Sequence, residues 1–423
     1  MRGALRRRPV LAWAFYDWAN SAFATTVMAG FFPVFFKQHW NVGVAVTEST
    51  FRLGMTNGIA SALIALAAPV LGAIADRGGA RVRLLMAFTV MGAAATAALA
   101  LVPAGHWQVA AALYLAGSLG FWAGIVFSDS LLLHVAEPRE YDLVSGFGYA
   151  LGYLGGGLLF ATNVAMTLRP AWFGLADAAQ AVKASFVMVG VWWLIFALPL
   201  VFSVPEQAAS VRLTPAAAVR QGFGELARTL REIRRYRAIL WFLAAYWLYI
   251  DGVNTVIKMA VDYGLSLGFE AAQLVAALLL TQFVAFPAAL AFGWLGQRIG
   301  ARRGIFLALT VYAAATCFAY FLRDVRDFYL LAVVIGLVQG GVQSLSRSYF
   351  GRLVPEGKSS EFFGFYNMMG KFAAVLGPLL TGVVAKLTGD PRLSILSILL
   401  LFVGGATLLA CAPRRDGPAT ARG

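Results

Sequence analysis

The chain contains 423 residues, of which 60% are hydrophobic and only 13% are charged, and its mean hydropathy is +0.74. A soluble protein usually carries about a quarter charged residues, so this composition excludes a water-soluble fold. The net charge is +14, but the basic residues fall between apolar segments. That distribution argues against nucleic acid as a partner and indicates a chain that is oriented by a membrane.

Twelve apolar stretches follow one another along the chain. Most are long enough to cross a hydrocarbon core about 30 Å thick, and their Gly and Ala content suits close helix contact in lipid. We therefore predict an all-α integral membrane protein. The expected transmembrane helices are residues 11–37, 52–75, 83–103, 107–134, 143–167, 184–204, 238–262, 271–297, 304–322, 327–353, 361–387 and 393–412.

The positive charges predict the orientation of these helices. When the loops are placed on alternate sides, 23 of the 34 Lys and Arg residues lie on the side of the N-terminus. Positive loops are retained in the cytoplasm, so both termini are expected there. The frequent use of Arg and Ala suggests a bacterial source, and hence the inner membrane.

A polar interval divides the chain into two halves of six helices. We expect an N-terminal bundle at 1–204, a basic cytoplasmic linker at 205–237 and a C-terminal bundle with a short tail at 238–423. Apolar residues recur in the linker at helical spacing, with arginines on the other faces. The linker is therefore either an interfacial helix on anionic headgroups or a plain solvated connection.

The two halves repeat each other. The segment from Gly72 to Arg81 matches the one from Gly293 to Arg302 at an offset of 221 residues. Gly146 and Gly152 match glycines 218 residues later, and an Asp-x-x-Asn motif at Asp17 recurs at Asp251. Three ordered matches predict two pseudo-symmetric six-helix bundles in parallel orientation, with a cavity between them.

At these residues the chain resembles the major facilitator superfamily. The segment at Gly72, Asp76, Arg77, Gly79 and Arg81 matches the superfamily's loop signature, except at Ala80. The second copy has Gln297 in place of the acid. Narrower motifs resemble the vacuolar-effluxer-like family, namely Tyr16–Ser21, Gln343–Phe350, Glu361–Tyr366 and Gly370–Phe372.

The resemblance implies a secondary active transporter that works by alternating access and binds a small polar solute near the midplane. It suggests amino-acid export, without any cofactor and with a monomer as the functional unit. The antiporter-type Gly-Pro signature is not matched in the fifth span, so direction and proton coupling stay open. Two alternatives also stay open: a non-transporting receptor or scaffold on this fold, and a lipid translocase.

Ionisable residues inside the spans are the candidate site, because a charge there costs at least ~2.5–3.5 kcal/mol on insertion scales. By the repeat offset, Asp129 faces Arg347 at a similar depth. The two could form a gate pair, bind the two ends of a zwitterion, or be a permanent structural pair. In the resembled superfamily the first, fourth, seventh and tenth spans line the cavity. Further cavity candidates on these spans are Asn20, Asn254, Gln339 and Gln343.

Asp17 and Asp251 are the candidates for proton coupling, because a carboxylate shielded from water can load and release a proton. The alternative for each is a hydrogen bond that packs helices, with Asn20 or Asn254 one turn further on. Lys258 and Lys371 could reach toward an interface, and this interpretation is favoured for Lys258, which lies near the outer end of its span.

A cytoplasmic gate is predicted at the repeated loop. By resemblance, Gly72, Asp76, Arg77, Gly79, Arg81 and Arg298 would hold the two halves together in the outward-open state. The tryptophans, including Trp13 and Trp193, are expected to be mainly lipid or interface anchors. The three histidines show no metal-ligand spacing. The chain also lacks a phosphate-binding loop and a hydrolase nucleophile motif, so an enzyme is not expected.

Overall fold

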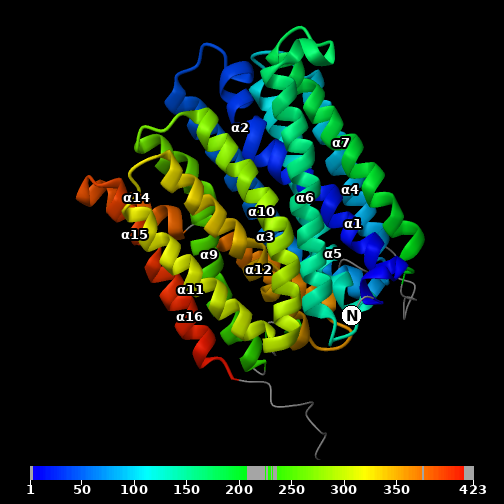
Figure 1. The fold of residues 1–423 in the computed structure, drawn as a ribbon. Coiled ribbons are helices and arrows are strands. Elements are labelled where there is room, and N and C mark those ends of the chain that lie inside the picture. Colours follow the sequence, from blue (N-terminus) through cyan, green and yellow to red (C-terminus); the bar gives the residue numbers. More distant parts are fainter. Residues whose placement is uncertain are drawn as a thin grey trace, which may run out of the picture.

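The computed structural model describes residues 3–206, 224, 227–229, 231, 236–373 and 376–413, and within these ranges it is nearly all helical (Figure 1). Most of the linker lies outside the described residues, and so does the interfacial helix predicted there. The end of the C-terminal tail also lies outside them.

Twelve helical segments of the described chain are long and apolar enough to cross a membrane, which confirms the predicted fold class. In the first half they are α1 (Arg8–Ala22) with η2 (Phe23–Phe31), α2 (Phe32–Phe35) and η3 (Phe36–Trp40), then α3 (Val46–Gly78), α4 (Arg81–Ala98) with η4 (Leu99–Leu101), α5 (Trp107–Val135), α6 (Tyr141–Leu168) and α7 (Ala178–Ser203). Short η1 (Ala4–Arg6) and η5 (Pro170–Phe173) lie in the connections.

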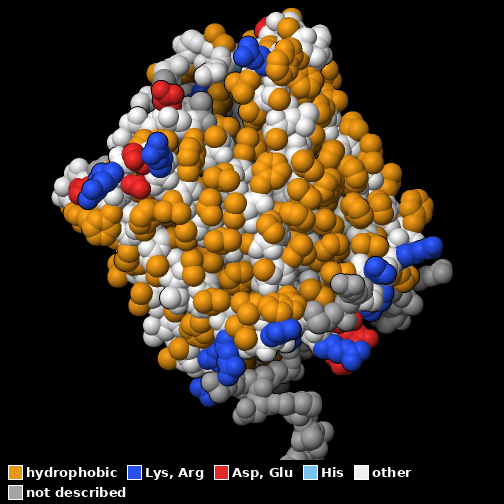
Figure 2. All heavy atoms as spheres, viewed as in Figure 1, with side chains coloured by type: hydrophobic (Ala, Val, Ile, Leu, Met, Phe, Trp, Pro, Cys, Tyr) orange, Lys and Arg blue, Asp and Glu red, His pale blue; other side chains and the backbone are white. Residues whose placement is uncertain are grey.

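The second half contains α9 (Arg237–Ser266), α10 (Ala271–Ile299), α11 (Ala301–Tyr320), α12 (Val325–Leu353), α13 (Ser359–Phe372), α14 (Leu376–Thr388), α15 (Pro391–Leu396) and α16 (Leu399–Cys411). On the face shown in Figure 2, apolar side chains form a broad band across the helices, and most of the charged side chains gather toward the two ends of the molecule. We call the end at which α1 begins the terminal face and the opposite end the far face.

Each half has its own hydrophobic core. One cluster of buried side chains runs from Val10 to Val204 and the other from Ile239 to Leu409. Among the described residues, neither cluster contains a fully buried residue of the other half, and the partly buried Leu133 packs against both. Because the buried residues of each core belong to one half, the bundles can move against each other with little change in either core.

The bundles approach each other most closely at glycines of the repeated motifs. A Cβ on Gly146 of α6 would lie 2.8 Å from the Cα of Gly293 of α10, and a Cβ on Gly364 of α13 would lie 2.6 Å from the Cα of Pro69 of α3. On the same α3 surface, a Cβ on Gly72 would overlap the backbone of α13 at Ser360. Small residues let helices approach this closely in lipid, and the offsets of 221 and 218 make the two crossings pseudo-symmetric.

Four predicted spans are not continuous α-helices: the third ends in the 3-10 segment η4, the twelfth is divided between α15 and α16, and the first and eleventh are interrupted as follows. The first contains π-helical segments at Phe23–Phe31 and Phe36–Trp40. The eleventh ends its first helix at Phe372 and resumes at Leu376. Non-helical backbone at membrane depth is tolerated where protein surrounds it, and such breaks often mark functional sites.

Candidate functional site

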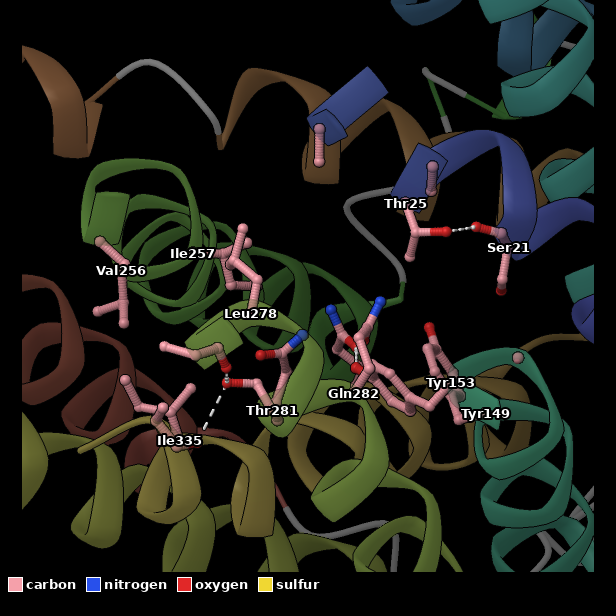
Figure 3. A pocket seen from close by; sticks show the side chains of 18 of the residues that line it. Ser21, Thr25, Tyr149, Tyr153, Val256, Ile257, Leu278, Thr281, Gln282 and Ile335 are labelled. Carbon is pink, nitrogen blue, oxygen red and sulfur yellow. Dashed lines mark hydrogen bonds between the residues drawn. The ribbon is translucent and has the colours of Figure 1, made fainter. Parts of the chain in front are cut away.

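A cavity of about 400 Å³ lies between the bundles and extends from the middle of the helices toward the far face. Side chains of α1, η2, α5 and α6 line it from the first half, and α9, α10, α11 and α12 line it from the second. Figure 3 shows Tyr149 and Tyr153 of α6 on one side of it, with Ile257 and Leu278 on another. Most of the lining is apolar, with a few polar groups, as in typical small-molecule sites.

A buried ion triad forms the floor of this cavity. Arg347 Nη1 of α12 lies 3.1 Å from Asp129 Oδ1 of α5 and 3.2 Å from Asp17 Oδ2 of α1. The side chains of Arg347 and Asp129 are 2% and 5% exposed, whereas that of Asp17 is 14% exposed. The base belongs to the second bundle and both acids to the first, so the triad joins the bundles.

All five N–H groups of Arg347 have acceptors. Its Nε donates to Ser145 Oγ, Nη1 donates to both carboxylates, and Nη2 donates to Asp17 Oδ2 and to the carbonyl oxygen of Ser145, at distances between 2.9 and 3.2 Å. The rings of Trp13 and Tyr149 lie 4.7 and 4.3 Å from its guanidinium carbon. In this conformation Arg347 therefore has no free donor for a solute carboxylate.

The sequence around the triad makes room for it. A Cβ on Gly148 would lie 2.5 Å from Asp17 Oδ2, and a Cβ on Gly152 would lie 2.7 Å from Ser21 Oγ. Both glycines lie on α6, which packs against α1. The Nε1 of Trp13 donates to the carbonyl oxygen of Ser128 at 2.7 Å, so the ring beneath the guanidinium is itself held in place.

Three predicted amides line the cavity near the triad. Asn20 is 3% exposed, and its Nδ2 finds no acceptor among the described residues. Gln343 Oε1 accepts a hydrogen bond from Tyr153 at 2.6 Å, and Gln339 lies one turn away on the same lining. A buried donor without an acceptor is rare in folded proteins, although Asn20 Nδ2 itself has almost no surface open to the cavity.

The structure does not bring Asp251 and Asn254 into this cavity, because neither is among its lining residues. Asp251 is fully buried and accepts hydrogen bonds from the backbone N–H groups of Leu376 and Gly377, at 2.9 and 3.0 Å. It therefore caps the N-terminus of α14 at the break in the eleventh span. A carboxylate at that position is stabilised by the free N–H groups and the helix dipole. This geometry corresponds to the helix-packing alternative.

On the terminal face, Asp76 and Arg81 of the predicted gate connect the bundles. Asp76 at the end of α3 accepts hydrogen bonds from the backbone N–H groups of Ser360 and Glu361 in the first turn of α13, at 3.0 and 2.8 Å. Arg81 pairs with Asp76 at 2.6 Å and donates to Ser360 Oγ at 2.9 Å. Gly79, with φ of 55°, ends α3 in the left-handed conformation that favours glycine. Arg77 is exposed on this face.

The second copy of the motif makes a different contact. Gln297 Nε2 donates to the carbonyl oxygen of Arg139 in the other bundle at 3.2 Å. Arg298 instead lies over the ring of Trp294 in its own helix, 4.0 Å from the ring centroid. Sequence analysis expected Arg298 to make a contact across the interface, but Gln297 makes that contact instead.

Several residues that sequence analysis did not single out belong to the interface. Asp142 of α6 forms a bidentate pair with Arg352 of α12, at 2.7 and 2.8 Å. Asn367 of α13 donates to Asp129 Oδ2 at 3.0 Å. At the 218-residue offset, the residue equivalent to Arg352 is His134, which is not an acid or an arginine. The repeat therefore did not predict the pair between Asp142 and Arg352.

One expectation about side-chain placement was wrong. Trp13 and Trp193 are fully buried rather than anchored at the lipid interface, and Trp13 instead supports Arg347. Lys371, whose placement the sequence left open, lies over the ring of Trp122, across the boundary between the bundles.

Comparisons with known proteins agree with this architecture. Residues 41–422 match the family model described as vacuole effluxer Atg22 like. The chain is 37% identical over 404 residues to a Bacillus subtilis protein named uncharacterized MFS-type transporter YxiO, covering 95% of this chain and 94% of that one. It is 24% identical over 389 residues to autophagy-related protein 22 of Saccharomyces cerevisiae, covering 79% and 72% of the two chains.

Solved structures share the fold. The human organic anion transporter MFSD10 superimposes with a TM-score of 0.71 at 17% identity, covering 95% of this chain and 99% of that one. The transporter FucP in its outward conformation gives 0.70 at 12% identity, covering 96% and 98%. The protein is thus an integral membrane transporter of the major facilitator superfamily, and it belongs to the Atg22-like vacuole effluxer family.

Proposed function

We propose that this protein is a secondary active transporter that exports a small polar solute, of the size and kind of an amino acid, in exchange for protons. The observation that carries the proposal is the Asp17–Arg347–Asp129 triad, because it joins the two bundles at the floor of the cavity. A solute or a proton that binds to the triad would change the contact between the bundles, and alternating access requires such a change.

The conformation supports this cycle. The cavity extends to the far face, whereas the terminal face is closed by the hydrogen bonds between Asp76 of α3 and the backbone of α13 and by the Asp142–Arg352 pair. With the termini in the cytoplasm, as the positive loops favour, this is the outward-open state. We place the transporter in a bacterial inner membrane, acting as a monomer.

Asp17 is the proposed proton carrier. It is the triad acid with the larger exposure to the cavity, and its Oδ1 accepts no hydrogen bond from the described residues, whereas both oxygens of Asp129 are occupied. Because Asp251 caps a helix away from the cavity, we assign it no coupling role.

The test is transport by purified protein in liposomes that contain a pH-sensitive dye. A panel of amino acids and related metabolites is added, and solute-driven proton movement and solute counterflow are recorded. We expect at least one solute to move protons in the wild type. We expect Arg347→Ala to abolish the movement although the variant still inserts into the membrane. Counterflow without proton movement would contradict the proposed proton coupling. Full transport by Arg347→Ala would contradict the assignment of the triad as the site.

A further inference from the structure

The charges that the cavity leaves available determine which group of a solute can be recognised. Arg347 is the cation of the triad, yet all its donors have acceptors, two aromatic rings lie against its guanidinium, and its side chain is 2% exposed. Lys371 lies over the ring of Trp122 and is not among the residues that line the cavity. The cavity floor therefore offers a solute no free positive charge.

The available charge is negative. Asp17 is the more exposed member of the triad, and its Oδ1 is free of hydrogen bonds within the described chain. The groups that face Asp17 are Arg347 of α12, Asp129 of α5, and the Trp13 and Tyr149 rings against the guanidinium. Two acids around one base leave one negative charge in an apolar surrounding, where an uncompensated charge is costly.

From this geometry we infer that the transported solute carries an amine, and that its ammonium group binds the Asp17 carboxylate at the same place as the exchanged proton. The inference rests on the proposed function and defines its substrate class. Either a proton or an ammonium group balances the charge of the triad. When R–NH₃⁺ binds, the protonated Asp17 must release its proton, so the two cations exclude each other, and their competition produces exchange.

A second group completes the subsite. Asn20 lies three residues after Asp17 on the same helix, which places it about 4.5 Å further toward the far face. Its Nδ2 is unpartnered and almost fully buried. When its side chain turns toward the cavity, Asn20 would donate to an oxygen of the solute one helical turn from the ammonium. The aromatic residues of the lining, which include Phe121 and Phe328, would pack against the solute's apolar body.

Three probes that share one aromatic body test the inference. These are 2-phenylethylamine, phenylalanine and 3-phenylpropionate, and their binding to the purified full chain is measured by calorimetry at several pH values. We expect the amine and the amino acid to bind, the carboxylic acid to bind at least tenfold more weakly, and the amine's affinity to fall as the pH falls. Tighter binding of 3-phenylpropionate, no binding of either amine, or an affinity independent of pH would overturn the inference.

The matched variants are Asp17→Asn and Asp177→Asn. Asp17→Asn should weaken amine binding between about tenfold and a hundredfold, since it removes a charge-assisted hydrogen bond. Asp177 caps α7 at an exposed position by accepting from Gln180 N, and Asn caps helices as well as Asp does, so Asp177→Asn should bind as the wild type does. Equal binding by both variants would overturn the inference.

Binding and transport are separable in this design. If the amines bind through Asp17 but cross the membrane without moving protons, the proposed exchange fails while the recognition of the ammonium group stands. If solutes exchange for protons but 3-phenylpropionate binds best, the recognition fails while the transporter assignment stands.

Discussion

At Gly148, the absence of a side chain is what allows Asp17 to reach Arg347. A Cβ there would lie 2.5 Å from the carboxylate oxygen and 2.8 Å from the ring of Trp13. Because Trp13 is held by its own hydrogen bond, the carboxylate is the group that must move. The geometry of the triad therefore depends on a residue that carries no chemistry of its own.

Gly148→Ala should consequently lower solute transport by roughly tenfold, since one displaced charge-assisted hydrogen bond is worth ~1.5–3 kcal/mol. Initial rates of counterflow in liposomes measure this effect. Gly382→Ala is the control, because a Cβ there meets nothing within 4 Å. Equal rates for the two variants would show that the position of Asp17 is not critical.

The triad also predicts an energetic coupling. Arg347→Ala leaves two buried carboxylates without their cation, and breaking a buried pair in this way costs about 3–5 kcal/mol. Adding Asp129→Asn removes one of these uncompensated charges, so the double variant should be more stable than Arg347→Ala alone. A double-mutant cycle, with unfolding free energies measured on the purified wild type, both single variants and the double variant, checks this prediction. Strictly additive losses of unfolding free energy would contradict the coupling.

At the scale of the helices, Asp251 connects the seventh span to the break in the eleventh. Asp251→Ala removes the acceptor for the N–H groups of Leu376 and Gly377. We expect a loss of about 0.5–2 kcal/mol in unfolding free energy, with solute-driven proton movement retained by the folded fraction. Thermal unfolding and the liposome assay together check this prediction, and loss of proton coupling at unchanged stability would restore Asp251 as a coupling residue.

Sequence analysis found the helices because each one is a long apolar run, and it placed Asp129 opposite Arg347 because the halves repeat. It could not distinguish the roles of Asp17 and Asp251, because the same Asp-x-x-Asn pattern occurs at both. Their difference arises from the break after Phe372, which creates a free helix N-terminus beside Asp251 only. Nor could it predict that Trp13 supports Arg347, because burial within a bundle and exposure to lipid favour the same apolar residues.

At the scale of the whole molecule, the closure of the terminal face depends on glycines at the bundle crossings. A Cβ on Gly72 would overlap the backbone of α13, whereas one on Gly58 in the same helix would meet nothing within 4 Å. Gly72→Ala should therefore separate the bundles on the terminal face and populate the inward-open state, and Gly58→Ala should not.

Alkylation of Ser344→Cys, in a chain whose Cys317 and Cys411 are replaced by Ser, reports this change. Ser344 is fully buried, and its carbonyl oxygen accepts from Ser145 across the interface at 2.8 Å. We expect the Gly72→Ala background to react several-fold faster than the Gly58→Ala background with a reagent added on the terminal face. Equal protection in both would mean that the glycine crossing does not control closure.

The crossings at Gly146–Gly293 and Gly72–Ser360 have a consequence for the speed of the cycle. They bring backbone against backbone, so parting them frees no long side chains and uncovers little apolar surface. The resistance to opening is then concentrated in a handful of ionic and helix-end contacts, each of which ligand or proton can weaken. Two bundles packed in this way can share a large interface and still be separated by only a low free-energy barrier between the two conformations.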